Sequence, residues 1–465
     1  MKRNPWLLTL AISLYCISSF GQSWVSEPRL GKMLVQQALN KPVGASTGIL
    51  INTQKQFQSI DGFGYTLTGG SAQLIYALEA SKRKALLEEL FGLGPTSIGI
   101  SVLRIAVGAS DLDGQVFSYD DVPTGQKDPS LKQFSLKASQ SDLIPLMQAI
   151  KKINPKIKFM ATPWSPPAWM KDNQSSKGGS LLIGNYEVYA NYLVRYLQEM
   201  KALGLEMDYL TPQNEPLHPG NNPSLLMLAS EQNQFIKKHL GPAFQKAGLK
   251  TKIIVYDHNC DKPEYPLEIL NDPITRKYVA GSAFHLYNGD ISALGQVRKA
   301  HPDKDVYFTE QWTGAKGDFA GDFNWHIKNV IIGALNNDAK TALEWNLAND
   351  PNWEPHTPGG CTECKGALTI DNNGQILRNQ AYYIIAQASK FIPTGSKRIE
   401  ISNLPNGMNG VAVLRPDQQV VVLLQNETQN TINTSIGLSG KYWNLELTKE
   451  STVTILLDKE VRGKR

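Results

Sequence analysis

The sequence has little of what a metalloprotein needs. Its 465 residues include four cysteines and seven histidines, scattered along the chain. Cys361 and Cys364 form a C-x-x-C pair, but no second such pair and no nearby pair of histidines completes a zinc ligand set. We therefore predict neither a metal site nor a cofactor, and we interpret the cysteines as a structural disulfide or buried thiols.

Long apolar runs are missing beyond the first part of the chain. Two basic residues precede an apolar run from Trp6 to about Phe20, and small residues stand at Ser19 and Gly21. This three-part pattern is typical of a secretory signal peptide, so residues 1–21 are predicted to be removed and the mature protein to be secreted or periplasmic. A membrane anchor is the alternative, but the run is short for a span of ~20 residues, and Ser and Tyr interrupt it. No integral membrane span is expected after signal removal.

Removal of the signal changes two counts. Cys16 is lost, and the three remaining cysteines permit one disulfide and one free thiol, with the pairing of Cys260, Cys361 and Cys364 left open. Lys2 and Arg3 are also lost, so the formal net charge falls from +5 to +3. Such a small and dispersed charge argues against nucleic acid as a partner.

The rest of the chain shows a regular alternation of short apolar runs and longer helical patterns. This rhythm is typical of a parallel sheet with crossover helices, and eight strand-helix units predict a (β/α)8 TIM barrel over residues 53–392. In the predicted helix at 185–204, Tyr189, Leu193, Tyr196 and Met200 fall at helical spacing. A last helix is expected around residues 378–391. The predicted strands are 57–64, 99–107, 157–163, 207–213, 251–257, 279–287, 306–310 and 341–347.

After Pro393 the pattern changes to an alternation of period two. The stretches GVAVLRPDQQVVVLLQN and WNLELTKESTVTILL indicate antiparallel strands of a β-sandwich over residues 393–465. The segment 22–52, which includes TGILIN, also has an extended pattern and is predicted to join that sandwich. The second domain is therefore expected to be built from both chain ends.

Two glutamates stand at predicted strand ends, where a TIM barrel has its active site. The fourth strand ends in QNEP, which contains Asn214 and Glu215, and the seventh ends in TEQW, which contains Glu310. Pro216 disfavours helical geometry at Glu215, so we expect that residue to be extended. Two carboxylates facing one pocket are what glycoside hydrolysis requires, since one protonates the departing oxygen while the other attacks or assists at the anomeric carbon.

Aromatic and polar residues near the other strand ends extend this prediction. Sugar rings pack on flat aromatic surfaces, and Trp164 and Trp345 are the tryptophans at strand ends that we expect to bind one. Hydroxyl-rich substrates also need donors and acceptors in fixed directions. We interpret His258, which follows the fifth strand, as a buried polar residue and not as a substrate ligand. The further polar candidates are Arg104, Asp111, His285, Tyr287 and Asn346.

The motifs taken together resemble glycoside hydrolase family 30, which includes glucosylceramidases and β-1,6-glucanases. The resemblance covers nearly all of the mature chain, in order. It is carried by DGFG (61–64), LRIAVGASD (103–111), ATPWSPPAWMK (161–171), TPQNEP (211–216), FHLY (284–287), FTEQW (308–312), EWNLA (344–348) and SKFIP (389–393).

The resemblance implies a retaining mechanism in which Glu215 is the acid/base and Glu310 the nucleophile. It also implies that Asn214 bonds the 2-hydroxyl of the sugar and that Asp111 helps to hold the terminal glucose. Trp164 and Trp345 match positions that hold the same glucose, and Arg104, His285 and Tyr287 match the wall behind the nucleophile. Glu310 is then expected to be ionised, and Glu215 to hold its proton near neutrality.

The chain departs from lysosomal glucosylceramidase in the parts of the rim that would contact the leaving group. These departures are Leu286, Gln311, Trp312 and the loop 349–366. They favour β-1,6-linked glucan over glucosylceramide as the substrate, because an additional Trp at the rim would suit a second sugar ring. A carbohydrate or a glycolipid is thus the predicted partner. A non-catalytic sugar-binding protein is less favoured, because both carboxylates are present.

Overall fold

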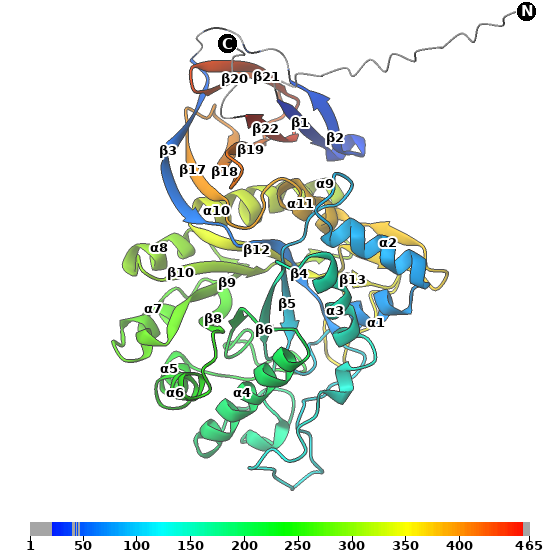
Figure 1. Ribbon diagram of the computed structural model, residues 1–465, viewed down its shortest axis with the longest axis vertical. Helices are drawn as coiled ribbons and strands as arrows, with labels where there is room; N and C mark the ends of the chain where they lie inside the picture. Colours follow the sequence, from blue (N-terminus) through cyan, green and yellow to red (C-terminus); the bar gives the residue numbers. More distant parts are fainter. Residues whose placement is uncertain (1–20, 40–41, 43, 45–46, 459–465) are drawn as a thin grey trace, which may run out of the picture.

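The computed structural model describes residues 21–39, 42, 44 and 47–458. It consists of a closed barrel of parallel strands and, at one end of the molecule, a sheet made from both chain ends (Figure 1). The predicted fold, a TIM barrel with a β-sandwich, is confirmed. The predicted signal peptide, apart from Gly21, lies outside the described residues.

The barrel contains one strand from each of the eight apolar runs. Adjacent strands are parallel and follow chain order around the barrel, so their carboxyl ends meet at one face. Met160, Tyr209 and Tyr307 belong to the layer of side chains that fills its interior. The strands are β4 (Gly62–Thr66), β5 (Val102–Ala106), β6 (Lys158–Thr162), β7 (Tyr209–Leu210), β8 (Lys252–Cys260), β9 (Val279–Gly289), β10 (Asp305–Glu310) and β12 (Ala339–Asn346).

Helices cover the outside of the barrel. The amphipathic helix predicted at 185–204 is α4 (Tyr186–Ala202), which buries Tyr189, Leu193, Tyr196 and Met200. Gly204, at φ 80°, turns the chain just after this helix, in a conformation that glycine adopts at little cost. The other helices are α1 (Gly69–Ala77), α2 (Ala80–Phe91), α3 (Leu143–Ile153), α5 (Ala229–Phe235), α6 (Gly241–Lys246), α7 (Glu264–Asn271), α8 (Ser292–Ala300), α9 (Phe319–His326), α10 (Ala334–Asn336) and α11 (Gln380–Ser389).

Short elements complete the barrel domain. Two π-helical segments, η5 (Ile236–Leu240) and η7 (Ile327–Gly333), join α5 to α6 and α9 to α10. Five small strands lie in the loops beyond β10 and β12, and 3-10 turns occur along the chain. The strands are β11 (Thr313–Gly314), β13 (Ala348–Asn349), β14 (Cys364–Lys365), β15 (Leu368–Ile370) and β16 (Ile376–Arg378), and the turns are η1 (Pro28–Leu30), η2 (Leu136–Ser139), η3 (Ala168–Met170), η4 (Ile183–Asn185) and η6 (Thr275–Lys277).

The second sheet combines strands from both chain ends, as the sequence predicts. Its order is β2-β1-β22-β19-β18-β17-β3-β20-β21, and the pairing of β3 with β20 is parallel whereas the others are antiparallel. Alternate side chains of these strands form a separate apolar core that includes Val422, Ile436 and Ile455. The strands are β1 (Gln22–Glu27), β2 (Lys32–Ala38), β3 (Ile49–Ser59), β17 (Lys397–Ser402), β18 (Met408–Leu414), β19 (Gln419–Asn426), β20 (Ile432–Leu438), β21 (Lys441–Leu447) and β22 (Thr452–Asp458).

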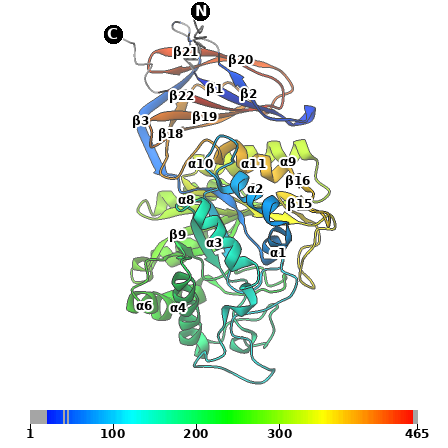
Figure 2. The same cartoon turned by 45° about the vertical axis from the view of Figure 1, so that its right-hand side comes forward.

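The sheet packs on α9, α10 and α11 of the barrel (Figures 1 and 2). Trp24 of β1 contacts Phe391 with ring centroids 4.5 Å apart. The buried side chain of Gln387 on α11 accepts a hydrogen bond from Ser26 and donates one to Thr454, each at 2.8 Å. One helix of the barrel is therefore bonded to strands from both chain ends. Among the described residues, no helix is both long and apolar enough to cross a membrane.

Candidate active site

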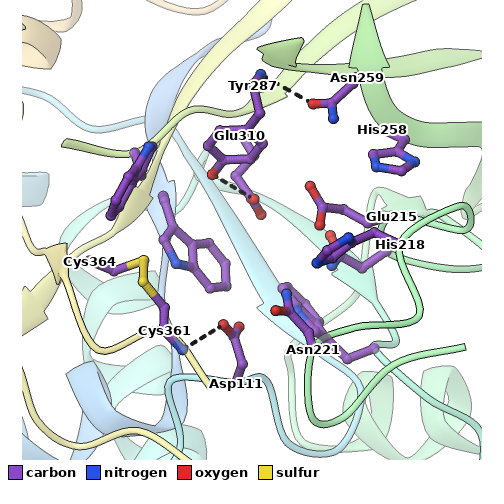
Figure 3. Close-up of a pocket in the computed structure, with 14 residues that line it drawn as sticks. Asp111, Glu215, His218, Asn221, His258, Asn259, Tyr287, Glu310, Cys361 and Cys364 are labelled. Atoms are coloured by element: carbon purple, nitrogen blue, oxygen red, sulfur yellow. Dashed lines mark hydrogen bonds between the residues drawn. A yellow bond between two sulfur atoms is a disulfide. The ribbon is translucent and has the colours of Figure 1, made fainter. Parts of the chain in front are cut away.

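The carboxyl ends of the barrel strands surround a cavity of about 360 Å³ (Figure 3). Eight of the residues predicted for the site line it. Arg104 and His285, also predicted, are fully buried and bond directly to cavity residues. The lining residues are Asp111, Trp164, Asn214, Glu215, His218, Asn221, His258, Asn259, Tyr287, Glu310, Trp312, Trp345, Cys361 and Cys364.

Glu215 and Glu310 face each other across this cavity (Figure 3). Glu215 follows β7, and Glu310 is the last residue of β10. One carboxylate oxygen of each lies within 4.8 Å of the other and of a ring nitrogen of His285. Two acidic side chains 95 positions apart in sequence thus share one small space, which satisfies the main geometric requirement of the predicted chemistry.

Glu310 is held by two donors. The Arg104 guanidinium donates to Oε2 at 2.6 Å, and the Tyr287 hydroxyl donates to Oε1 at 2.9 Å. Burial raises the pKa of Glu310, and the charge of Glu215 adds to this, although His285 and Arg104 oppose the increase. The carboxylate is therefore fixed in place by hydrogen bonds while its charge is only partly compensated.

The backbone at Glu215 differs from the prediction. Glu215 has φ 44°, in the left-handed region, so the expectation of an extended residue is wrong. Pro216 disfavours the right-handed helical region for the preceding residue, and the chain turns here, with the His218 N–H donating to the Glu215 carbonyl at 2.9 Å. The Glu215 N–H donates to the Asp257 carbonyl at 3.0 Å. A non-glycine residue in this region is strained, and such residues concentrate at functional sites.

His285 connects the pair to the floor of the site. Its Nδ1 lies 3.0 Å from Glu215 Oε1, and its Nε2 lies 3.2 Å from Asp257 Oδ1. Burial alone would lower its pKa, but the charge of Glu310 and the bonds to Asp257 and Glu215 raise the pKa to about 9. The resulting imidazolium lowers the pKa of Glu215 in spite of burial. Glu215 bonds to His285 and Glu310 bonds to Arg104, so each carboxylate lies against a positively charged group and the ionisation of one affects that of the other.

Asp257 is a central residue that sequence reasoning missed. Its carboxylate accepts from Arg104 at 2.8 Å and also from Thr211 and Thr309, and Arg104 holds its pKa far below the usual range although burial opposes this. Its φ of 67° lies in an irregular part of β8 that turns the side chain inward. Asp257 is the last residue of the predicted fifth strand, and this position at a strand end could have identified it as a site residue.

An apolar wall forms one side of the cavity. The rings of Trp164 and Trp345 stack with centroids 5.3 Å apart, and Trp312 packs beside them. A disulfide between Cys361 and Cys364 belongs to the same wall. The structure thereby settles the pairing that the sequence left open.

Several other residues are placed differently from the sequence-based expectation. Asn346 does not line the cavity, because its side-chain oxygen accepts hydrogen bonds from Thr68 and Ser71 at the start of α1. His258 is buried, as expected, and its pKa is lowered to about 4 by burial, yet it borders the cavity. The cavity also includes five residues that were not predicted for the site, namely His218, Asn221, Asn259 and the two cysteines Cys361 and Cys364.

The cluster of Glu215, His285 and Glu310 has the spacing of a metal site, but its surroundings do not suit a cation. Arg104 and the protonated His285 already supply positive charge next to both carboxylates. A metal ion would be repelled by both groups. The donor set fits an acid/base pair better than a metal centre.

Comparison with protein families gives two matches. Residues 60–392 match the model described as the glycosyl hydrolase family 30 TIM-barrel domain. Residues 395–455 match the glycosyl hydrolase family 30 beta sandwich domain. Together the two models span most of the described chain.

Individual relatives agree with these matches. Endo-1,6-beta-D-glucanase neg1 of Aspergillus fumigatus is 34% identical over 427 residues, which cover 86% of this chain and 85% of that protein. Lysosomal acid glucosylceramidase of Mus musculus is 29% identical, covering 84% of this chain and 80% of the relative. The solved structure of the endo-beta1,6-glucanase BT3312 aligns with a TM-score of 0.88 and 31% identity, over 95% of this chain and 99% of that one.

Proposed function

The chain belongs to glycosyl hydrolase family 30, and from this membership we propose that it cleaves β-1,6-linked glucan by double displacement, with Glu215 and Glu310 as the two reacting carboxylates. As a member of this family it is a retaining O-glycosyl hydrolase. Glucanases that are 34% and 31% identical to it support the linkage. The sequence at residues 1–21 supports export of the mature enzyme, which would give it access to a polymer outside the cell.

This proposal rests on the short distance between the two carboxylates. Oxygens of Glu215 and Glu310 lie within 4.8 Å of each other. Retaining glycosidases hold their carboxyl groups ~5–5.5 Å apart, whereas inverting enzymes need ~6.5–9.5 Å to admit a water between sugar and base. The close approach therefore supports a covalent glycosyl-enzyme rather than direct attack by water.

In the first step Glu310 attacks the anomeric carbon and forms an ester with it. The bond from that carbon to the glycosidic oxygen breaks, and Glu215 gives its proton to the departing oxygen. Arg104 and Tyr287 hold the attacking carboxylate in position through their two hydrogen bonds. The stacked Trp164 and Trp345 offer a flat surface for the sugar ring.

In the second step Glu215 acts as a base. It takes a proton from water, whose oxygen attacks the anomeric carbon and releases Glu310. Glu310 has no charge while it is esterified, so it no longer repels the charge on Glu215, and the nearby imidazolium of His285 favours the ionised form. The arrangement that lowers the pKa of Glu215 in the free site thus suits this second step.

The roles of the two glutamates can be tested with alanine variants and azide. Glu310→Ala should lower kcat on an aryl β-glucoside by roughly 10⁴-fold or more, and azide should then yield the α-glucosyl azide. Glu215→Ala should lose about 10²–10⁴-fold on poor leaving groups, and azide should yield the β-glucosyl azide. Each product identifies which face of the sugar has lost its carboxylate.

Product analysis tests the stereochemistry and the substrate. The first product seen by proton NMR should be the β-anomer, and an α-anomer would contradict the retaining assignment. We expect oligosaccharides from pustulan, which is β-1,6-linked, and little or no product from laminarin. Hydrolysis of glucosylceramide without hydrolysis of pustulan would replace the proposed substrate with a glycolipid.

A further inference from the structure

The disulfide Cys361–Cys364 lies in a loop that connects three other loops of the barrel mouth. This 357–365 loop follows β12 and β13 and ends in β14. The Thr357 N–H donates to the Asp111 carbonyl, in the segment after β5, at 2.9 Å. The Asn222 side chain, in the segment after β7, donates to the Pro358 carbonyl at 2.9 Å. β14 pairs with β11, just after Trp312.

Asp111 is the point at which this loop meets the cavity. The Cys361 N–H donates to its Oδ2 at 3.3 Å, as Figure 3 shows. Asp111 is 3% exposed, and its other oxygen, Oδ1, receives no hydrogen bond from any described residue. Burial and the charge of Glu310 raise the pKa of Asp111 to about 7. A buried carboxylate oxygen without a protein partner, next to a sugar-sized cavity, is suited to accept a hydrogen bond from a substrate hydroxyl.

The contact between this loop and Asp111 is tight. A Cβ built on Gly360 would lie 2.3 Å from the Asp111 carbonyl oxygen, closer than atoms can approach. The loop can therefore pack here only with glycine at position 360. The disulfide joins residues three positions apart, directly after this glycine, and fixes the course of the chain where the Cys361 N–H is presented.

We propose that the Cys361–Cys364 disulfide is a positioning element for substrate binding, which holds Asp111 so that its Oδ1 faces a sugar hydroxyl and completes the wall formed by Trp164, Trp312 and Trp345. The inference rests on the proposed function, because the ligand is the glucosyl unit bound in that site. It assigns the disulfide to substrate binding and not to the chemical step, since both cysteines belong to the apolar wall with Trp164 and Trp345.

The test uses the double variant Cys361→Ala with Cys364→Ala. It keeps the backbone N–H at position 361 but removes the covalent link that restrains the loop. We expect KM for an aryl β-glucoside and Ki for glucose to rise about tenfold, the effect of losing one hydrogen bond to a charged group, while kcat changes less than about threefold. Gly360→Ala, which keeps the disulfide, should give the same pattern by pushing the loop away from Asp111. Lys316→Ala is the control, because it breaks an exposed ion pair to Glu363 of the same loop, and neither residue lines the cavity.

Reduction of the wild type provides a test without substitution. A phosphine such as TCEP converts the disulfide to two thiols and is itself oxidised to the phosphine oxide, with oxygen from water. It should raise KM in the wild type and leave the double alanine variant unchanged. The proposal would be overturned if KM and Ki stayed unchanged in the reduced wild type and in a folded double alanine or Gly360→Ala variant. Failure of the wild type to cleave any β-glucoside would instead contradict the proposed function.

Discussion

At the residue scale, charge is distributed among five buried groups at the site. Arg104 and His285 are positive, and they compensate part of the charge of Asp257, Glu215 and Glu310. Full protonation of all three carboxylates is disfavoured by the two cations, and full ionisation is disfavoured by burial and mutual repulsion. Glu215 and Glu310 therefore titrate as a pair that shares a proton, and the pH dependence of activity should be bell-shaped.

The variant His285→Gln tests which group controls this shared proton. Loss of the imidazolium removes a positive charge that lowers the pKa of Glu215, so that pKa should rise. Glu215 would then keep its proton to higher pH, and the alkaline limb of kcat/KM should move up by about one pH unit or more. The profile of kcat/KM from pH 4 to 10 measures this shift.

His258→Gln is the matched control for that experiment. The ring of His258 lies 6.4 Å from the ring of His285, and its pKa of about 4 means that it carries no charge near neutrality. Its replacement should leave the alkaline limb in place, even if KM changes. If the limb also stays in place in a folded His285→Gln variant, then His285 does not set the ionisation of Glu215.

At the scale of elements, loops at the barrel mouth are joined by buried polar contacts. Lys171, just after η3, is buried and donates to Ser165, to the Ser176 carbonyl and to the Ser224 carbonyl. It links the segment after β6 to the segment after β7, which also contains Glu215. Burial lowers the pKa of Lys171 to about 7, because no carboxylate bonds to its ammonium group to compensate for the lost hydration.

This lysine should make stability depend on pH. Between about pH 7 and 10.5 the unfolded chain binds a proton at Lys171 that the folded chain has released, so the free energy of unfolding should increase with pH. The difference between wild type and Lys171→Met should grow by up to about 1.4 kcal/mol per pH unit in this range. Urea denaturation at pH 6.5, 8.0 and 9.5 measures the difference.

Lys177→Met serves as the control, because Lys177 lies in the same segment but is exposed. Its difference from the wild type should be the same at each pH. A pH-independent difference for Lys171→Met would mean that the folded protein keeps the ammonium protonated throughout.

At the scale of the whole molecule, the two domains share buried contacts. Gln387 of α11 bonds to Ser26 and Thr454, and Trp24 packs on Phe391. These contacts join the N-terminal strands, the last barrel helix and the C-terminal strands. The domains should therefore unfold together, since exposure of this interface would leave buried polar groups of both without partners.

Trp24→Ala tests this coupling. Trp24 is 9% exposed, and its loss should lower the free energy of unfolding by about 3 kcal/mol. Activity, which reports on the barrel, should be lost at the same urea concentration as far-UV circular dichroism, in the variant as in the wild type. Leu93→Ala is the control, since Leu93 is 74% exposed and should change little. Loss of circular dichroism in two steps, with activity retained after the first, would show that the domains unfold independently.

Much of the fold could be predicted from the sequence, because its evidence is local. Each barrel strand is a short apolar run, and α4 shows its buried face through the spacing of Tyr189, Leu193 and Tyr196. The sandwich strands alternate with period two, which likewise needs no knowledge of distant residues. Glu215 and Glu310 could be identified because strand ends of a barrel converge whatever the details of packing.

The sequence by itself determined the barrel, the sandwich from both chain ends and the pair of glutamates, since these depend on periodicity and on position along strands. The tertiary structure decided the rest. It turned Glu215 into the left-handed region, bonded Asp257 to Arg104 and His285 beneath the pair, directed Asn346 toward α1 and joined Cys361 to Cys364 beside Asp111. The reason is that backbone turns, protonation and side-chain partners depend on neighbours from distant parts of the chain, which meet only when the barrel closes.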